Sequence, residues 1–461
     1  MDFLGATCWL VDEQGARWSR NRLAIEVDRM STAFERMSPG PVFVHARNDV
    51  ATVIVILAAF AARRAIGVLP AFDGRDVDRA LYTKFRPAWV FTGDAQASPA
   101  ADYRQVSTGG MSAWERRSQE HPGCHRDLAL LLTTSGSTGS PKLVRLSATA
   151  IQSNTSAIVK ALGIVRADVA ITSLPLAYTY GLSILLTHLL AGAGVVLSGA
   201  SVTDRRFWST VDEYSVTTLA GVPSTYAMLR AMKWQVEASP SVRTFTQAGG
   251  KLDPDVADWM RTMIKRTAVR FHVMYGQTEA TARITVLPAD EFLTHPGAVG
   301  FPVDGRVEIE SDLSAANHPG RIVVSSPSIM MGYAESAQDL LREDDMRGRL
   351  VTGDLGRFDS EGRLYLTGRE KRIAKVSGIR VDLDDVERLL KEDVEAIVSV
   401  TESEQIAVAI VADPEAAAEH VKTLARRLGL RRDAFVVRAV DQIPLLSSGK
   451  PDYLSLQKGS A

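Results

Sequence analysis

The sequence has few cysteines, no excess of one charge and no long apolar run, and each shortage excludes a class of protein. Two cysteines, Cys8 and Cys124, occur in 461 residues. Their spacing fits no zinc site, and so few thiols indicate a reducing compartment. Lysine and arginine total 53 against 54 aspartate and glutamate, a formal net charge of −1. This balance gives no indication of nucleic-acid binding.

The most apolar segment, residues 51–62, is shorter than the roughly 20 residues that cross a membrane. Asp49 and Arg63 flank this segment, so we expect a buried helix and no membrane span. The first residues include Asp2 and Asp12, acids in a region where a secretory signal needs bases. We therefore expect a cytoplasmic protein.

Short apolar runs alternate with helical stretches from residue 41 to about 127 and again from 169 to 274. That alternation is typical of parallel sheets with helices on their faces. Residues 297–367 instead place short β-like runs between Gly, Pro and Asp turns. We predict an α/β protein with a large N-terminal domain (1–368) of mainly parallel sheets that includes a β-rich subdomain (about 297–367). A small, mobile α+β C-terminal domain (371–461) follows.

A loop rich in glycine and hydroxyl groups follows the strand-like run 128–132, and Pro141 and Lys142 close it. Its residues are Thr134, Ser135, Gly136, Ser137, Thr138 and Gly139. Such a loop can be a simple linker, but its N–H groups, hydroxyls and the Lys142 cation also suit phosphate oxygens. It stands between a strand and a helix-like stretch from about Thr149, where nucleotide loops lie. Pro141 and Leu143 break the Walker A pattern, which disfavours a P-loop kinase.

This stretch resembles the [ST]-S-G-[ST]-T-G-x-P-K signature of the AMP-forming adenylating enzymes. The superfamily comprises acyl-CoA synthetases, adenylation domains of peptide synthetases and luciferases, and Leu143 stands where it commonly has Gly. The run Tyr275-Gly276-Gln277-Thr278-Glu279 matches its second signature, Y-G-x-T-E. Read from the residues alone, Tyr275 offers a face to a purine, Thr278 a hydroxyl to a phosphate, and Glu279 an oxygen to Mg²⁺. The alternative is a surface turn with an exposed glutamate.

Two later blocks continue the resemblance. Thr352-Gly-Asp354, followed by Arg369, matches the residues that contact ribose and nucleotide in the family; by itself Asp354 reads as a turn cap. Residues 443–450 match the P-x-x-x-x-G-K motif, whose lysine reaches the nucleotide. Without that match, Lys450 reads as a solubilising surface residue.

Residues 368–381 resemble the family's G-R-x-[DK]-x-x-x-K-x-x-G-x-x-[VI] hinge between the two domains. Lys371 falls on the hinge position, and Gly378 on the glycine that lines the path of a pantetheine arm. A weaker glycine corner at 246–252 matches the region that holds adenine, and it contains Gly249, Gly250 and Lys251.

The acyl pocket is expected near residues 174–183, which resemble the L-P-L-x-H-x-x-G-L stretch of acyl-CoA synthetases and include Gly181. Tyr178 stands where histidine is usual. No acid occurs there through Leu190, whereas activators of α-amino acids use an aspartate, so a carboxylic acid without an α-amino group is favoured. Tyr178, Tyr180 and Met274 suggest a largely apolar acyl group, although they could equally be ordinary core.

The resemblance implies that a carboxylate attacks the α-phosphate of ATP, pyrophosphate leaves, and a second nucleophile takes the acyl group from the adenylate while AMP leaves. It implies Glu279 as Mg²⁺ ligand, Thr278 at the α-phosphate, and Lys450 as stabiliser of the adenylation transition state. The acceptor is coenzyme A or the phosphopantetheine of a carrier protein, with an amine as the alternative. A non-catalytic relative would have lost Lys450 or Glu279, and both are present.

Overall fold

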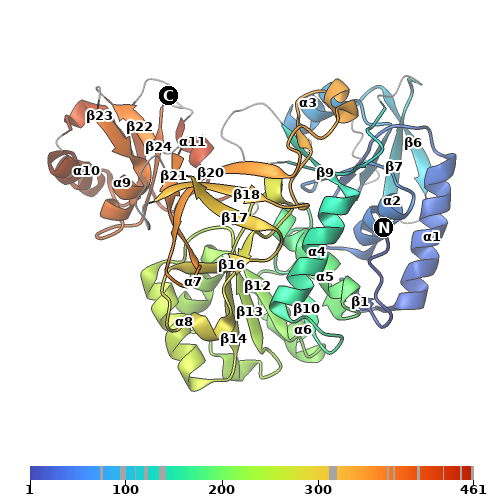
Figure 1. Cartoon of the computed structure of the whole chain (residues 1–461), viewed down its shortest axis with the longest axis horizontal. Coiled ribbons are helices and arrows are strands. Elements are labelled where there is room, and N and C mark those ends of the chain that lie inside the picture. The colour runs from blue at the N-terminus through green and yellow to red at the C-terminus, as the bar shows by residue number, and fades with distance from the viewer. Residues whose placement is uncertain are drawn as a thin grey trace. The chain divides into compact units, whose positions relative to one another are not determined.

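The computed structural model (Figure 1) describes residues 1–72, 76–93, 100–108, 111–118, 123–133, 142–310, 319–370, 373–376, 379–401, 405–428, 430–446 and 449–457. The chain divides into two compact units. The N-terminal unit comprises Met1–Val307, Val324–Leu350 and Gly362–Leu364. The C-terminal unit comprises Glu308–Val323, Val351–Glu361 and Tyr365–Ala461.

The first sheet of the N-terminal unit has the strand order β19-β9-β8-β4-β3-β5-β7-β6. Its strands are β3 (Val42–His45), β4 (Ile66–Leu69), β5 (Trp89–Thr92), β6 (Tyr103–Thr108), β7 (Met111–Arg116), β8 (Leu128–Thr133), β9 (Leu143–Ser147) and β19 (Gly332–Ala334). The central strands β5, β3, β4 and β8 are parallel, and antiparallel strands flank them. Every residue of β3 and β4 is buried, as expected for parallel strands covered on both faces.

The second sheet holds six parallel strands in the order β14-β13-β12-β10-β11-β1. They are β1 (Trp9–Val11), β10 (Val169–Ile171), β11 (Gly194–Val196), β12 (Thr218–Gly221), β13 (Thr244–Gln247) and β14 (Arg270–Tyr275). β2 (Arg17–Ser19) pairs antiparallel with β1, while β15 (Thr285–Val286) and β16 (Ala298–Pro302) extend the other end.

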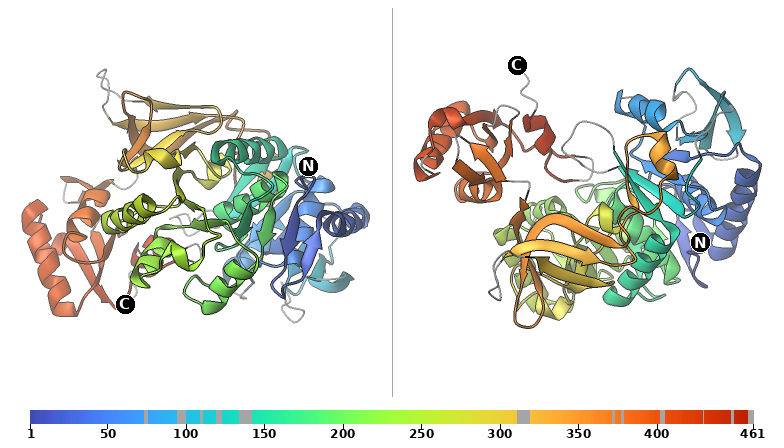
Figure 2. Two further views of the ribbon diagram at one scale, coloured as in Figure 1. Left: turned by 90° about the horizontal axis from the view of Figure 1, so that it is seen from below. Right: turned by 45° about the horizontal axis from the view of Figure 1, so that its top comes forward.

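Helices cover the sheets, and two of them lie between the sheets. α4 (Ala148–Leu162) contacts β8 and β9 of the first sheet, α5 (Thr179–Leu190) contacts β10 and β11 of the second, and the two helices contact each other (Figure 2). α5 is therefore buried from Thr179 to Leu189, which explains why most of its residues are apolar. The other helices are α1 (Arg20–Arg36), α2 (Val50–Ala61), α3 (Asp76–Phe85), α6 (Arg205–Glu213), α7 (Pro223–Ala231) and α8 (Pro254–Arg266).

The C-terminal unit contains a three-stranded sheet of β24 (Ala396–Val400), β25 (Ile406–Val411) and β26 (Phe435–Val440). α9 (Leu383–Leu390), α10 (Pro414–Leu428) and α11 (Tyr453–Gln457) pack on this sheet, and Val386, Val408 and Val421 lie in its core. β22 (Ile373–Val376) and β23 (Ile379–Asp382) form a hairpin. β17 (Arg306–Glu310), β18 (Gly320–Ser325), β20 (Arg349–Phe358) and β21 (Leu364–Arg369) are adjacent in that order.

These sheets flanked by helices confirm the predicted α/β class. The helix expected from about Thr149 is α4, which begins at Ala148. Between the phosphate loop and this helix lies β9, a strand that the sequence analysis did not predict, which pairs antiparallel with β8. The sequence over 336–343 predicts a short helix, which is wrong, because the structure has a 3₁₀ turn over Ala337–Leu341. In this turn the Asp339 carboxylate accepts hydrogen bonds from the N–H groups of Glu335 and Ser336. The domain boundary at 368–371 stays a prediction.

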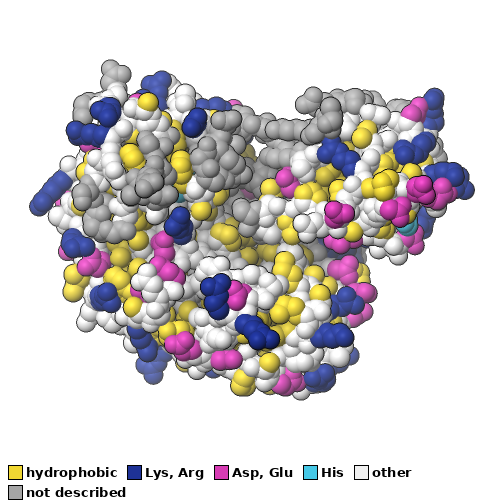
Figure 3. Space-filling model, turned by 180° about the vertical axis from the view of Figure 1, so that it is seen from behind, with side chains coloured by type: hydrophobic (Ala, Val, Ile, Leu, Met, Phe, Trp, Pro, Cys, Tyr) yellow, Lys and Arg dark blue, Asp and Glu magenta, His cyan; other side chains and the backbone are white. Residues whose placement is uncertain are grey.

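Charge and apolarity are distributed much as the composition predicts. Lys, Arg, Asp and Glu side chains are interspersed over the face drawn in Figure 3. The apolar segment at 51–62 is the buried helix α2. Within the described ranges, no helix has both the length and the apolar character needed to span a bilayer.

Candidate active site

The loop after β14 folds back tightly on itself. A Cβ at Gly276 would overlap the carbonyl oxygen of Ala282, so only glycine fits where the loop closes. The loop holds a 3₁₀ turn, Thr278–Ala280, and then Thr281, whose φ is +62°. A β-branched residue rarely adopts this conformation, and such strain gathers at functional sites. The Thr281 hydroxyl anchors the turn by donating to the Ser328 carbonyl at 2.7 Å.

Glu279 is partly exposed, and the segment that includes β19 holds it from two sides. Its backbone carbonyl accepts the N–H of Met330 at 2.9 Å, and the Tyr333 hydroxyl donates to its Oε1 at 2.7 Å. Burial, followed by the Glu279 charge and this hydrogen bond, raises the pKa of Tyr333. Glu279 has no ion pair with any described residue. A carboxylate that is oriented but lacks a cationic partner fits Mg²⁺, which takes one or two protein carboxylates and fills its shell with phosphate oxygens and water.

Thr278 joins this loop to the start of α5. Its Oγ1 lies 2.9 Å from Oγ1 of Thr179, the first residue of α5. Beside it, the side-chain nitrogen of Gln277 is buried without a hydrogen-bond partner in the described part of the chain. An unmatched buried donor is costly unless a ligand completes it.

Lys142 directly precedes β9, at the end of the first sheet where β9 pairs with β19. Its Nζ is 2.7 Å from Oε1 of Glu335, and β9 and β19 pair so that Tyr333 opposes Val144. The pairing therefore places Lys142 near Tyr333, the residue that is hydrogen-bonded to Glu279. The predicted loop residues Thr134, Ser135, Gly136, Ser137, Thr138 and Gly139 lie outside the described residues.

The predicted acyl-pocket residues gather beneath the Thr278 loop. Tyr180 is 3% exposed, belongs to one apolar cluster with Met274, and packs with its ring centre 6.2 Å from that of Tyr178. Burial raises the pKa of both Tyr178 and Tyr180 to about 12, so both phenols are neutral at physiological pH. Gly181 has a packing role, because a Cβ there would overlap the carbonyl oxygen of Pro175.

The predicted adenine region also belongs to the N-terminal unit. Tyr275 is buried at the end of β14. Gly249, Gly250 and Lys251 follow β13, and the Gln247 side chain donates to the Gly250 carbonyl at 2.7 Å. Lys251 is exposed.

Two predicted nucleotide contacts pair with each other in the C-terminal unit. Arg369 Nε lies 2.9 Å from Oδ1 of Asp354, and the Asp354 N–H donates to the Thr352 hydroxyl at 3.1 Å. Asp354 is buried and the Arg369 side chain is exposed. The pair therefore holds a buried aspartate in place through an accessible cation.

Lys450 lies on a turn in which its carbonyl accepts the N–H of Leu446 at 2.8 Å, next to a bridge between Leu445 and Pro451. Its side chain is partly buried. Lys371 and Gly378 lie outside the described residues. The meeting of Lys450 with Thr278 and Glu279 in one site stays a prediction.

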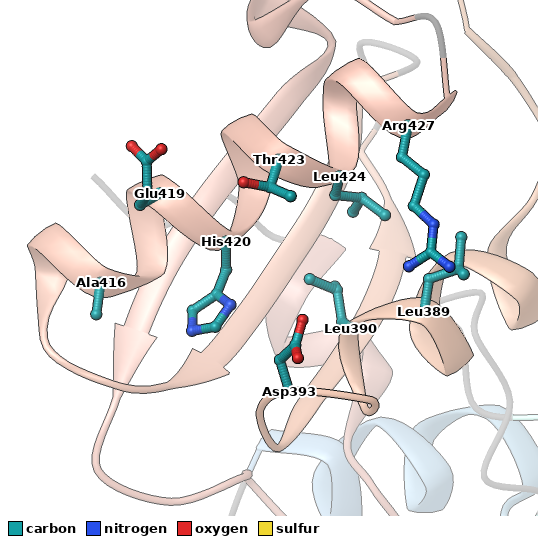
Figure 4. A pocket seen from close by; sticks show the side chains of 9 residues that line it. All are labelled: Leu389, Leu390, Asp393, Ala416, Glu419, His420, Thr423, Leu424 and Arg427. Atoms are coloured by element: carbon teal, nitrogen blue, oxygen red, sulfur yellow. The ribbon is translucent and has the colours of Figure 1, made fainter.

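A surface pocket of about 370 Å³ opens between α9 and α10 of the C-terminal unit (Figure 4). Its lining is Leu389, Leu390, Asp393, Ala416, Glu419, His420, Thr423, Leu424 and Arg427. No predicted site residue lines it, so we do not regard it as the active site.

Sequence reasoning missed three residues of this region. Thr179 lies in the 174–183 stretch expected to form the acyl pocket, but that stretch does not predict its hydrogen bond to Thr278. Tyr333 carries no motif of its own and reaches the site through its bond to Glu279. Arg283 follows Glu279 by four residues, and no motif assigns it a role. In the structure it is 2% exposed.

Residues 5–334 match the family model described as AMP-binding enzyme. The chain belongs to that family. This AMP-binding enzyme is 28% identical over 272 residues to an oxalate–CoA ligase of Arabidopsis thaliana and 29% identical over 268 residues to a 2-succinylbenzoate–CoA ligase of Bacillus cytotoxicus. The two matches cover 57% and 56% of this chain, and 52% and 53% of those proteins. The chain thus spans about half the length of these curated relatives.

The fold of the AMP-binding enzyme is that of solved adenylating enzymes. Its structure matches an o-succinylbenzoate CoA synthetase from Bacillus subtilis, solved in complex with an acyl-adenylate intermediate, with a TM-score of 0.75. The match covers 98% of this chain and 95% of that one at 21% sequence identity. At this identity the likeness supports the fold.

Proposed function

We propose that this AMP-binding enzyme activates a carboxylic acid with ATP and then passes the acyl group to a thiol. The observation that carries the proposal is the strained loop from Gly276 to Ala282, which lies inside the family match. It presents Thr278 and Glu279 together, each held by a side chain from another element.

In the first step, a carboxylate oxygen of the acid forms a bond to the α-phosphorus of ATP, and the bond from that phosphorus to the bridging oxygen breaks. Pyrophosphate leaves with the electron pair, and an acyl-adenylate remains. Thr278 would donate to an α-phosphate oxygen. Glu279 would hold Mg²⁺, which when bound neutralises charge on the leaving pyrophosphate. Lys142 would release Glu335 and contact the β- and γ-phosphates.

In the second step, a thiolate sulfur forms a bond to the acyl carbon, the carbon–oxygen bond to AMP breaks, and AMP leaves. Asp354 would hold the ribose hydroxyls with Arg369 beside it, and Lys450 would stabilise charge in the first step. Lys371 would serve as hinge and Gly378 would line the pantetheine path. The relatives named above are CoA ligases, which favours coenzyme A over a carrier protein or an amine.

The test is acid-dependent release of pyrophosphate and AMP. A panel of carboxylic acids is incubated with ATP and Mg²⁺, first without an acceptor and then with coenzyme A, a carrier protein or a simple amine. We expect pyrophosphate exchange with some acids alone, and AMP with a thioester only when a thiol is added. Release of ADP in place of AMP, or no acid dependence across the panel, would refute the proposal.

A further inference from the structure

Arg283 occupies a fixed position between α4 and α5. Its backbone N–H donates to Oδ1 of Asn154 at 3.1 Å, and its carbonyl accepts from Nδ2 of the same side chain at 2.9 Å. Asn154 is fully buried in α4. Both backbone groups of Arg283 are thus held by one amide, so its side chain leaves the loop in a defined direction.

Among the residues that the structure describes, the guanidinium contacts only neutral groups. It lies over the Tyr180 ring, 4.0 Å from the centre. Nη1 donates to the Ser183 hydroxyl at 2.8 Å, and Nε lies 3.4 Å from the Met274 sulfur. Nη2 is buried and has no hydrogen-bond partner, and no carboxylate in the described ranges pairs with it.

Arg145 provides a comparison within the same unit. It is equally buried, but its Nη2 lies 2.7 Å from Oδ2 of Asp345 and 2.8 Å from the carbonyl of Met331, and its Nη1 donates to the carbonyl of Arg342. Asp345 therefore neutralises the buried guanidinium of Arg145. Arginine stays protonated in proteins, and a buried charge without a countercharge is unfavourable. No described residue supplies such a countercharge to Arg283.

The neighbours of Arg283 are residues predicted for the acyl pocket. It stacks on Tyr180 and touches Met274, while Thr179, next to Tyr180 on α5, is hydrogen-bonded to Thr278. Thr278, which is proposed to contact the reacting phosphate, and Arg283 therefore contact adjacent residues at the start of α5. Tyr178, which packs edge-on to Tyr180, is partly exposed.

We propose that Arg283 selects an acid with a second carboxylate, which accepts a hydrogen bond from Nη2 while the first carboxylate reacts with ATP. This inference rests on the proposed function. The Ser183 hydroxyl and the Tyr180 ring hold the guanidinium in place, and its charge excludes acyl groups that end in an apolar carbon. A charge-assisted hydrogen bond of this kind changes selectivity roughly tenfold to a hundredfold.

The experiment compares matched acids in pyrophosphate exchange: butanoate with succinate, pentanoate with glutarate, and benzoate with phthalate. We expect the wild-type enzyme to favour the dicarboxylate of at least one pair by roughly tenfold or more in kcat/KM. Arg283→Met, which keeps the bulk and removes the charge, should abolish or invert that preference, whereas Arg283→Lys should retain part of it. Arg426→Met, the same change at an exposed arginine of α10, should keep the preference.

Three results would overturn the inference. One is a wild-type enzyme that uses the monocarboxylate of every pair at least as well, which leaves the proposed function intact and needs no variant to fold. Another is an Arg283→Met enzyme, folded by circular dichroism, with the wild-type ratio. The third is that none of the acids supports pyrophosphate exchange, which would refute the proposed function as well.

Discussion

The hydroxyl of Tyr333 donates a 2.7 Å hydrogen bond to Glu279 across 54 residues of chain. The bond fixes Oε1 of Glu279 and thereby the orientation of the whole carboxylate. Hydrogen bonds of this kind orient the side chains that bind metals in proteins. Since no described cation pairs with Glu279, the arrangement is that of a ligand held ready for Mg²⁺.

Glu279→Gln should therefore slow pyrophosphate exchange by roughly 10²- to 10³-fold and raise the Mg²⁺ concentration needed for half-maximal rate. The amide keeps the size of the side chain but loses the charge that attracts the metal. Rates measured across a Mg²⁺ series test this. Glu415→Gln, an exposed residue on α10, is the control and should leave the series unchanged. An unaltered Mg²⁺ requirement in Glu279→Gln would exclude it as the ligand.

Tyr333→Phe should give a smaller defect of the same kind, because it removes only the orienting hydrogen bond. We expect roughly a tenfold to hundredfold loss in metal affinity or rate. The double variant with Glu279→Gln should be little worse than Glu279→Gln alone, since the tyrosine acts through the carboxylate. Additive losses in the double variant would mean that Tyr333 acts independently.

The turn after β14 gives a prediction about glycine. Gly276→Ala should distort the loop, because its Cβ would overlap the Ala282 carbonyl. We expect a loss of about 1–3 kcal/mol in unfolding free energy and a collapse of exchange activity. Gly199→Ala is the matched control, since nothing lies within 4 Å of a Cβ there and its φ is not positive. Chemical unfolding and exchange assays on both variants decide the point, and a fully active Gly276→Ala would contradict it.

How much the sequence could predict depends on where each residue's partner lies. Local apolar patterns predict a strand over 66–69 and a helix over 414–428, and β4 and α10 have these bounds in the structure. β9 could not be recognised, because Arg145 breaks its apolar run and the neutralising Asp345 is 200 residues away.

The same reasoning applies to the site. Thr278 and Glu279 can be recognised from the sequence, because they belong to one contiguous motif. The roles of Tyr333 and Arg283 depend on contacts with residues of other elements, which the sequence does not reveal. Periodicity reports which face is buried but gives no indication of whether a buried charge is paired.

Lys450 should matter for only one half of the reaction if it stabilises adenylation. Lys450→Ala is expected to slow acid-dependent pyrophosphate exchange by roughly 10²- to 10³-fold. Thioester formation from a synthetic acyl-adenylate and coenzyme A should change only a few-fold. Lys422→Ala removes an exposed lysine of the same unit that pairs with Glu419, and it should affect neither step. Equal losses in both half-reactions would show that Lys450 has a general binding role.

His188 links the stability of the N-terminal unit to pH. It is fully buried in α5, its Nδ1–H donates to the Ile184 carbonyl at 2.9 Å, and its Nε2 has no partner in the described part of the chain. Burial lowers the pKa of His188 from 6.5 to about 4. Between pH 6.5 and pH 4 the unfolded chain therefore binds a proton at His188 that the folded chain does not bind. The stability that the neutral imidazole contributes is complete above pH 6.5 and is lost as the pH falls toward 4.

The loss should be on the order of 3 kcal/mol at pH 4. His188→Leu removes the proton uptake, so the melting temperature of the variant should fall less than that of the wild type between pH 7 and pH 4. Comparing the two slopes cancels the carboxylates that also titrate at low pH. His295→Gln, a partly exposed histidine in a loop, should keep the wild-type slope. If His188→Leu also keeps it, the imidazole is already protonated in the folded state, and the neutral buried form is wrong.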